Sequence, residues 1–273
     1  MSIKTGLKRL KGHKRALFGH VLRIVPFHAA MGISKSLMAA HGMGTGGFVG
    51  SSGERGVFRL INAPRPVLFD VGGHTGEYSE AFLDDFPEGS VFVFEPSTNH
   101  VDLLRQRLAG KRNVTVFPVG LAAEAGTRTL YKDRDVSGLA SLSQRRLDHF
   151  NIRMDIAESV VIRTVDDVVA ETAVSSIDLL KLDVEGHELA VMQGAVDAMA
   201  RGTIRLVQFE FGGCNLDTRT SLQDFFYFFR TYNFSIGLVS PSGRIHVLDK
   251  YNELYEQYRT TNFVAAPRSV LLG

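Results

Sequence analysis

The stretch VLFDVGGHTGE, residues 67–77, joins a short apolar run to three closely spaced glycines. The run VLFDV is typical of a strand buried on both faces of a sheet, and glycines suit the point where such a strand turns into a helix. Backbone amides and a helix N-terminus can approach a ligand closely at that point. The stretch therefore predicts a strand, a ligand-binding loop and a helix, in that order.

The residues around the first glycine narrow the class of ligand. A pyrophosphate-binding fingerprint reads G-x-G-x-x-G, but Val71 occupies its first glycine position and Asp70 precedes it. A carboxylate here would repel the diphosphate of NAD or FAD, and it would suit a cationic group such as the amino acid portion of S-adenosylmethionine. In the alternative interpretation, Asp70 caps the following helix and the glycines only form a tight turn.

A second acid ends the next predicted strand. The run SVFVFE, residues 90–95, finishes at Glu95, and Pro96 ends the strand. A carboxylate in this position can accept hydrogen bonds from both hydroxyls of a ribose, although a glutamate at a strand end can also be a solvated helix cap. Asp70 and Glu95, at the ends of neighbouring strands, together predict a nucleoside-binding site.

The chain from residue 67 onward alternates short apolar runs with segments of helical periodicity, which is typical of a doubly wound α/β fold with a mostly parallel sheet. Strands are predicted at 67–71, 90–95, 113–119, 127–133, 159–165, 177–184, 204–211 and 235–239. Helices are predicted near 77–86, 98–109, 166–171, 187–200 and 221–232. RIHVLD, residues 244–249, and TNFVAAP, residues 261–267, predict a closing antiparallel hairpin. We expect one such domain over residues 57–273.

Polar residues occupy alternate positions toward the ends of two central strands. Period-two alternation puts Lys181 and Asp183 on one face of the first strand, and Gln208 and Glu210 on one face of the second. These side chains would converge at the carboxyl ends of adjacent parallel strands, where such sheets bind ligands. Because unpartnered buried acids are costly, the cluster implies mutual pairing, a bound substrate or a metal ion.

Composition limits the class of protein. The chain has 273 residues, 44% of them apolar, and a formal net charge of +2, which gives no global reason to expect a nucleic-acid partner. Its single cysteine, Cys214, cannot form an intrachain disulfide, and we expect it to be structural. No apolar run approaches the length of about 20 residues that spans a bilayer. These features together predict a cytoplasmic protein.

The front of the chain is basic, since no acidic residue precedes Glu54. Apolar residues at helical spacing in the first 25 positions, with lysines and arginines between them, predict a basic amphipathic helix. A glycine-rich loop follows, so that residues 1–56 form an extension. Such a helix can pack on its own domain, pack on a second copy in a homodimer, lie peripherally on an anionic membrane, or lie on an acidic partner. The sequence leaves these four interpretations open.

Four segments carry a resemblance to a known family: DVGGHTGEYS, VFVFEPS, LLKLDVEGHE and VQFEFGG. Over roughly residues 65–267, the chain resembles the FkbM-type methyltransferases, which are S-adenosylmethionine-dependent O-methyltransferases. The resemblance implies the class I methyltransferase fold, a Rossmann-like arrangement with a mostly parallel seven-stranded sheet and an antiparallel last strand. It also implies S-adenosylmethionine as the cofactor.

The resemblance assigns roles to individual residues. Asp70, Gly72 and Gly76 should line the methionine part of the cofactor, and Glu95 should hold its ribose. The general fold places the adenine near Gly120 and Leu121. The full set of expected cofactor-binding residues is Asp70, Gly72, Gly73, His74, Thr75, Gly76, Glu95, Pro96, Gly120, Leu121 and Asp183.

Methyl transfer to a hydroxyl oxygen requires that oxygen to be aligned with the methyl group and to lose its proton. His187, just past the strand end, could be a direct general base. Alternatively, Asp183 and Glu210 could hold Mg²⁺, which would favour deprotonation of the substrate oxygen, as in catechol O-methyltransferase. The expected catalytic residues are Asp183, His187, Glu210 and Lys181, and the expected metal ligands are Asp183 and Glu210.

The expected function is O-methylation of a sugar, glycolipid or secondary metabolite, a substrate class that the resemblance alone implies. The partner would be a small-molecule or glycoside acceptor with a free hydroxyl. The irregular segment 133–158 is expected to contact it, with Ser137, Ser141 and Arg145 as candidates. The alternative is a non-catalytic nucleoside-binding or membrane-docking module with the same fold. An NAD-dependent dehydrogenase is disfavoured by Asp70 and Val71.

Overall fold

The computed structural model describes residues 24–47 and 49–272, and the chain divides into two compact units after Ala40. In the first unit the described helix is α2 (Phe27–Ala40). The basic helix predicted over the first 25 residues lies almost entirely outside the described residues. None of the described helices is long and apolar enough to cross a bilayer. The second unit begins at His41 rather than at residue 57, so it includes the glycine-rich stretch.

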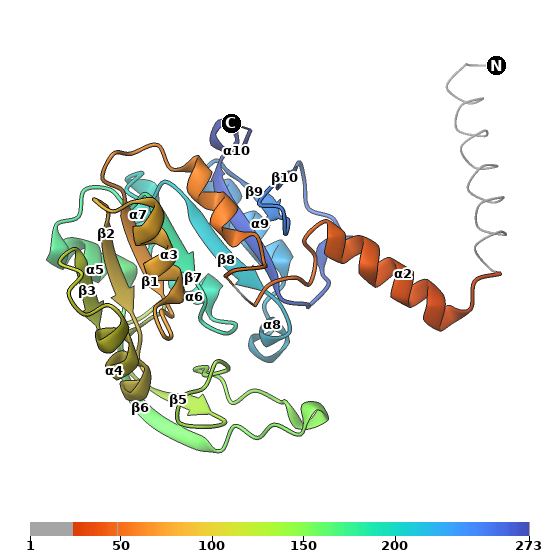
Figure 1. Ribbon diagram of the computed structural model, residues 1–273, viewed down its shortest axis with the longest axis horizontal. Helices are drawn as coiled ribbons and strands as arrows, with labels where there is room; N and C mark the ends of the chain where they lie inside the picture. Colours follow the sequence, from red (N-terminus) through yellow and green to blue (C-terminus); the bar gives the residue numbers. More distant parts are fainter. Residues whose placement is uncertain (1–23, 48, 273) are drawn as a thin grey trace. The chain divides into compact units, whose positions relative to one another are not determined.

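An eight-stranded sheet with the order β10-β9-β11-β8-β7-β1-β2-β3 forms the centre of the second unit (Figure 1). Its strands are β1 (Val67–Val71), β2 (Ser90–Phe94), β3 (Val114–Phe117), β7 (Leu179–Leu182), β8 (Val207–Phe211), β9 (Phe234–Val239), β10 (Ile245–Leu248) and β11 (Thr261–Pro267). The pairs from β3 through β8 are parallel, and β11 is antiparallel to both β8 and β9. This arrangement confirms the predicted doubly wound α/β fold with an antiparallel last strand.

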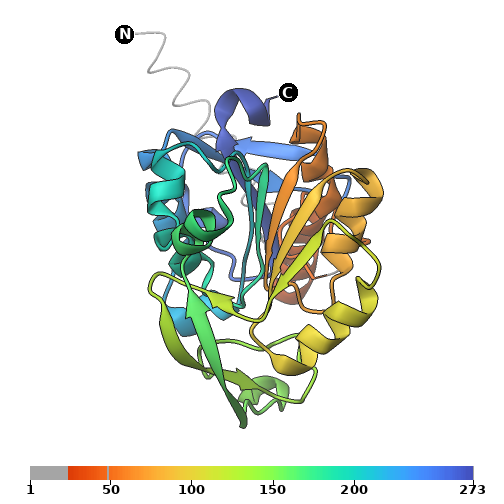
Figure 2. The same ribbon diagram turned by 90° about the vertical axis from the view of Figure 1, so that its left-hand side faces the viewer.

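Helices cover both faces of this sheet, and Figure 2 shows the two sets on opposite sides. One face carries η1 (Glu54–Leu60), α3 (Glu77–Asp85) and α4 (Thr98–Arg107), and the other carries α5 (Val165–Thr172), α6 (Glu188–Gln193), α7 (Val196–Ala200) and α9 (Leu222–Thr231). The shorter elements are η2 (Asp148–Phe150), α8 (Cys214–Thr218), η3 (Glu253–Tyr255) and α10 (Arg268–Leu271). Both α5 and α9 begin with a capping box, which satisfies backbone N–H groups at their first turns.

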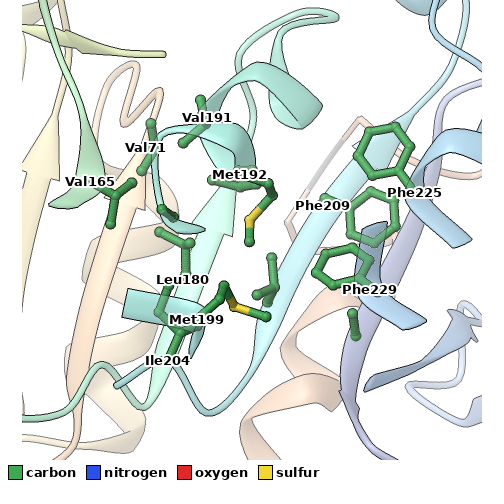
Figure 3. Packing of buried hydrophobic residues seen from close by; sticks show 14 of the residues in the cluster. Val71, Val165, Leu180, Val191, Met192, Met199, Ile204, Phe209, Phe225 and Phe229 are labelled. Carbon is green, nitrogen blue, oxygen red and sulfur yellow. The ribbon is translucent and has the colours of Figure 1, made fainter. Parts of the chain in front are cut away.

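The core on the α9 face is rich in aromatic side chains. Phe209 of β8 stacks on Phe225 of α9 at a centroid distance of 4.6 Å, and Phe229 packs beside them (Figure 3). Met192 and Met199 extend the same cluster from α6 and α7. Phe225 and Phe229 of α9 are therefore core residues, whereas Tyr227 of the same aromatic run is 61% exposed.

Three details of the second unit differ from the sequence prediction. The predicted hairpin of residues 244–249 with 261–267 is wrong, because β10 pairs with β9 and β11 lies between β9 and β8. A tight turn in which Gly243 N donates to Ser240 O joins β9 to β10, so β10 adds an eighth strand to the predicted seven. The predicted helix 187–200 is two helices, with a break at Gly194. A Cβ there would lie 2.1 Å from Ala122 O.

The irregular middle of the chain forms a second sheet of its own. Its order is β4-β6-β5, from β4 (Gly120–Leu121), β5 (Gly126–Lys132) and β6 (Ile156–Arg163). Both views show β5 and β6 at one end of the main sheet (Figures 1 and 2). Hydrogen bonds from residues 141 and 143 to the loop after β7 show that this is the end where β7 finishes.

Candidate active site

The glycine loop is shaped by close backbone contacts. Gly72 has a φ of 81° and donates its N–H to Phe94 O, and a Cβ on it would lie 1.9 Å from the carbonyl oxygen of Asp183. Gly76, with a φ of 84°, is the residue from which α3 begins. His74 between them is a non-glycine residue with a positive φ of 47°. The loop therefore turns tightly at the carboxyl edge of the sheet and touches the end of β7.

Asp70 lies beneath this loop. Its side chain is 2% exposed and accepts a hydrogen bond of 2.5 Å from Ser79 Oγ, and a Cβ built at Gly73 would lie 3.8 Å from Asp70 Oδ2. Burial raises the pKa of Asp70 to about 6, although the Ser79 hydroxyl and the Lys181 ammonium oppose the shift. A buried carboxylate that still ionises near neutral pH provides negative charge directly under the loop.

Glu95, at the end of β2, connects to the same loop. Its carboxylate accepts hydrogen bonds from the backbone N–H of His74 at 3.0 Å and of Ser97 at 2.9 Å, and His100 Nδ1 lies 3.4 Å away. The rings of His74 and His100 lie 4.5 Å apart, and burial followed by the charge of His100 lowers the pKa of His74. Glu95 thus fixes the glycine loop in addition to offering further lone pairs to a ligand.

The residues expected around an adenine lie next to this strand end. A Cβ on Gly120 would come within 3.6 Å of Pro96. Leu121 is 2% exposed, and its side chain belongs to the hydrophobic core. Thr75 Oγ1 lies 3.3 Å from His74 Nδ1. The structure therefore brings the expected cofactor residues of β1, β2 and β4 together along one edge.

The polar residues of β7 and β8 converge as their alternation predicts. Lys181 is the register partner of Gln208, and Lys181 Nζ lies 3.4 Å from Asp183 Oδ2. Burial works against the charged ammonium of Lys181, but Asp183 and neighbouring carboxylates outweigh it and raise its pKa. Glu210 is half-buried, and burial followed by the charge of Asp183 raises the pKa of Glu210 well above its ordinary value.

Two residues of this polar face were missed by the sequence prediction. Glu54 of η1 is 3% exposed, and its Oε2 lies 3.8 Å from Lys181 Nζ. Asn262 of β11 is the register partner of Glu210, is 1% exposed, and has no hydrogen-bond partner for either amide atom among the described residues. Both come from parts of the chain far from the predicted motifs, and no local pattern marks them.

His187 lies apart from this cluster. Its Nε2 is 3.0 Å from Ser143 Oγ in the inserted segment, which is the stretch 133–155 between β5 and β6. Burial followed by the charge of Arg128 lowers the pKa of His187. Glu188 beside it is fully buried and accepts hydrogen bonds from Val184 N and Gly186 N, so it shapes the loop after β7.

The inserted segment is bound to the main sheet by polar contacts. Arg145 forms an ion pair with Glu185, and its Nε lies 3.6 Å from Asp217 Oδ2. Ser141 Oγ donates to Glu185 O at 2.9 Å, and Ser137 Oγ donates to Asp133. The three candidate acceptor contacts of this segment, Ser137, Ser141 and Arg145, therefore all have partners within the protein.

The donor set at Asp183 and Glu210 does not fit the predicted Mg²⁺ site. Among the described residues, no group of three or more His, Cys, Asp and Glu side chains could hold a metal ion. The Lys181 ammonium at 3.4 Å from Asp183 would repel a divalent cation placed between the two carboxylates. These residues therefore do not form a magnesium site.

Comparison with known proteins gives concordant matches. The model of the family described as "Methyltransferase FkbM domain" matches residues 70–236. The 2-O-methyltransferase NoeI of Sinorhizobium fredii is 27% identical over 157 residues, which cover 54% of this chain and 65% of that protein. The hexuronic acid methyltransferase AglP of Haloferax volcanii is 28% identical over 167 residues, covering 59% of this chain and 64% of that protein. The chain thus spans just under two thirds of the length of these relatives.

Among solved structures, the chain is similar to a crystal structure of methyltransferase FkbM from Methylobacillus flagellatus. The TM-score is 0.46 and the sequence identity 16%, and the match covers 74% of this chain and 44% of that one.

Proposed function

The chain belongs to the FkbM methyltransferase family, and from this premise we propose that it transfers the methyl group of S-adenosylmethionine to a hydroxyl oxygen of its acceptor. The observation that carries the proposal is the hydrogen bond of 3.0 Å from His74 N to Glu95. It joins the glycine loop of β1 to the acid of β2, the two features that a nucleoside ligand requires at one place. Buried Asp70 adds the negative charge that a sulfonium ligand favours and a diphosphate does not.

The chemical step is an in-line displacement. The acceptor oxygen forms a bond to the methyl carbon, the carbon–sulfur bond breaks, and the sulfonium leaves as the neutral thioether S-adenosylhomocysteine. A general base takes the hydroxyl proton. Asp183, next to the glycine loop, would border the cofactor, and Glu210 on the next strand would face the acceptor.

We assign the base to Glu210 in preference to His187. Glu210 is on the polar face with Asp183, is half-buried, and receives no side-chain hydrogen bond from the described residues. Its raised pKa brings its proton affinity closer to that needed at neutral pH. His187 is the second candidate, because its lowered pKa keeps the imidazole neutral and able to accept a proton.

The acceptor class in this proposal is a sugar hydroxyl, free or in a glycoside. The support comes from the two relatives, one named a 2-O-methyltransferase and the other a hexuronic acid methyltransferase. The inserted segment between β5 and β6 lies at the carboxyl end of β7, where it would form one wall of the acceptor site. A homodimer or peripheral membrane contact through the N-terminal helix also stays a proposal, because that helix lies outside the described residues.

Calorimetric titration with S-adenosylmethionine, S-adenosylhomocysteine and NADH tests the cofactor. We expect both adenosyl ligands to bind at micromolar concentration and NADH not to bind. Glu95→Ala should abolish binding while the protein stays folded. Glu124→Gln, a change at an exposed carboxylate, should leave binding unchanged.

Binding of NADH alone would identify a dehydrogenase, and binding of none of the three would favour a non-catalytic module. Transfer of a radiolabelled methyl group to methyl glycosides of hexoses and hexuronic acids, with catechol for comparison, then tests the acceptor class.

A further inference from the structure

Lys181 is a buried cation that needs more than one counter-charge. Its side chain is 3% exposed, and the two carboxylates beside it differ sharply in their surroundings. Asp183 is 40% exposed at the edge of the sheet, whereas the side chain of Glu54 is 4% exposed beneath it. The ring of Tyr78 lies 5.4 Å from the ammonium and closes another side. The ammonium is therefore shared between an outer carboxylate and an inner one.

The inner carboxylate is itself held in a defined orientation. Ser52 Oγ donates to Glu54 Oε1 at 3.1 Å, and Gln208 Nε2 donates to Glu54 Oε2 at 3.1 Å. Tyr78 Oη donates to Gln208 Oε1 at 2.6 Å, which fixes which end of the amide faces Glu54. Burial raises the pKa of Glu54, and the Lys181 ammonium and the two donated hydrogen bonds oppose that rise by favouring the ionised carboxylate.

We propose that Glu54 is a positioning residue that acts through Lys181: it shares the ammonium that contacts Asp183, so that the Asp183 charge is only partly neutralised and attracts the cationic cofactor. The inference rests on the proposed function, because it takes Asp183 as a border of the cofactor site. Glu54 lies before the matched segment 70–236, so the family comparison assigns it no role.

The mechanism predicts a particular loss. Without the charge of Glu54, the ammonium has Asp183 as its remaining close carboxylate partner and pairs with it more tightly. Asp183 is then less able to attract the sulfonium and amino group of S-adenosylmethionine. Replacement of Lys181 by a neutral side chain removes the link, after which the charge at position 54 should no longer matter.

A double-mutant cycle read by calorimetric binding of S-adenosylmethionine tests this mechanism. Glu54→Gln should weaken binding about fivefold in the wild-type background and less than about twofold in a Lys181→Met background, a difference in the usual range for coupled neighbours. Glu88→Gln, at an exposed carboxylate, is the matched control and should bind as wild type does. Thermal unfolding of each variant checks that it is folded.

The outcomes separate this inference from the proposed function. An equal loss of affinity in both backgrounds would mean that the charge of Glu54 acts on the ligand directly and not through Lys181. No loss of affinity in either background would mean that Glu54 only supports the fold. Either result overturns the inference. If Glu54→Gln does not fold, Glu54→Asp carries the test, since its shorter side chain retracts from Lys181. It should bind about two- to threefold more weakly, and wild-type affinity would overturn the inference. Failure of the wild-type protein to bind S-adenosylmethionine would overturn the proposed function as well.

Discussion

Gly72 lies directly against the carbonyl oxygen of Asp183, close enough that a Cβ on the glycine would be 1.9 Å from that atom. Asp183 N in turn donates to Val71 O at 3.0 Å. The glycine loop and the end of β7 are therefore parts of a single structure, and a change in one of them displaces the other.

This contact makes Gly72 intolerant of any side chain. Gly72→Ala should lower the free energy of unfolding by about 3 kcal/mol or more, because a backbone atom must move in addition to the strain of the positive φ. Gly110 has nearly the same φ, 82°, but open space around it. Gly110→Ala should therefore cost only about 1 kcal/mol. Urea unfolding of the two variants measures the difference between their free energies of unfolding. Equal losses of stability would mean that the contact between Gly72 and the carbonyl oxygen of Asp183 does not limit this position.

Cofactor affinity should depend on the ionisation of Asp70. The pKa of Asp70 is raised to about 6, so its carboxylate is ionised at pH 7.5 and gains a proton as the pH falls below about 6. Protonation removes negative charge beneath the loop, so affinity for S-adenosylmethionine should fall with decreasing pH. Calorimetry between pH 5 and 8 measures this trend. Asp70→Asn should bind weakly and without a step near pH 6, and a step that persists in that variant would assign the titration to another group.

The ion pair between Lys132 and Glu158 should contribute stability that is lost in acid. Burial opposes ionisation of Glu158, but hydrogen bonds from Lys132 at 2.6 Å and from Thr98 lower its pKa to about 2. Because the folded pKa lies below the ordinary glutamate value of 4.5, the stabilisation is fully present above about pH 4.5 and is lost as the pH falls toward 2.

Glu158→Gln should therefore cost about 2 kcal/mol at pH 7, and less as the pH falls. Urea unfolding at pH 7, 5 and 3.5 follows the difference between the variant and the wild type. A difference that stays constant over this range would show that packing, rather than charge, accounts for the loss.

The two candidate bases can be separated by the pH dependence of turnover. If Glu210 accepts the proton, Glu210→Gln should lower kcat by about 100-fold or more. His187→Gln should then change kcat less than about tenfold and leave the pH profile in place. The reverse pattern would assign the proton transfer to His187. Cofactor affinity, measured on the same samples, controls for damage to the binding site.

The fold was largely predictable because its signals are local. Buried parallel strands show as apolar runs, and the glycine loop of residues 72–76 requires a residue type that the sequence displays directly. The convergence of Lys181 with Gln208 followed from period-two alternation, since register and face depend on neighbouring residues of the same strand.

The parts that sequence reasoning missed depend on contacts between distant segments. Glu54 precedes its partner Lys181 by more than a hundred positions, and η1 around it has no periodicity that would mark the residue as buried. Likewise, the position of β11 beside β8 cannot be read from the apolar pattern of residues 261–267, which suits either neighbour. His187 had the right chemistry and the right distance from β7, but its ring faces Ser143 in a segment whose fold the sequence did not indicate.

The place of β11 between β8 and β9 has a consequence for biosynthesis. A ribosome delivers β8 well before β11, so the nascent chain carries an open edge on β8, and the β9–β10 hairpin has no partner to dock on. Unpaired edges of this kind invite association between chains. Because β11 pairs with both β8 and β9, the gap between them cannot close before β11 has emerged. The folding yield of this protein should therefore depend on chaperones that protect the edge until translation reaches that strand.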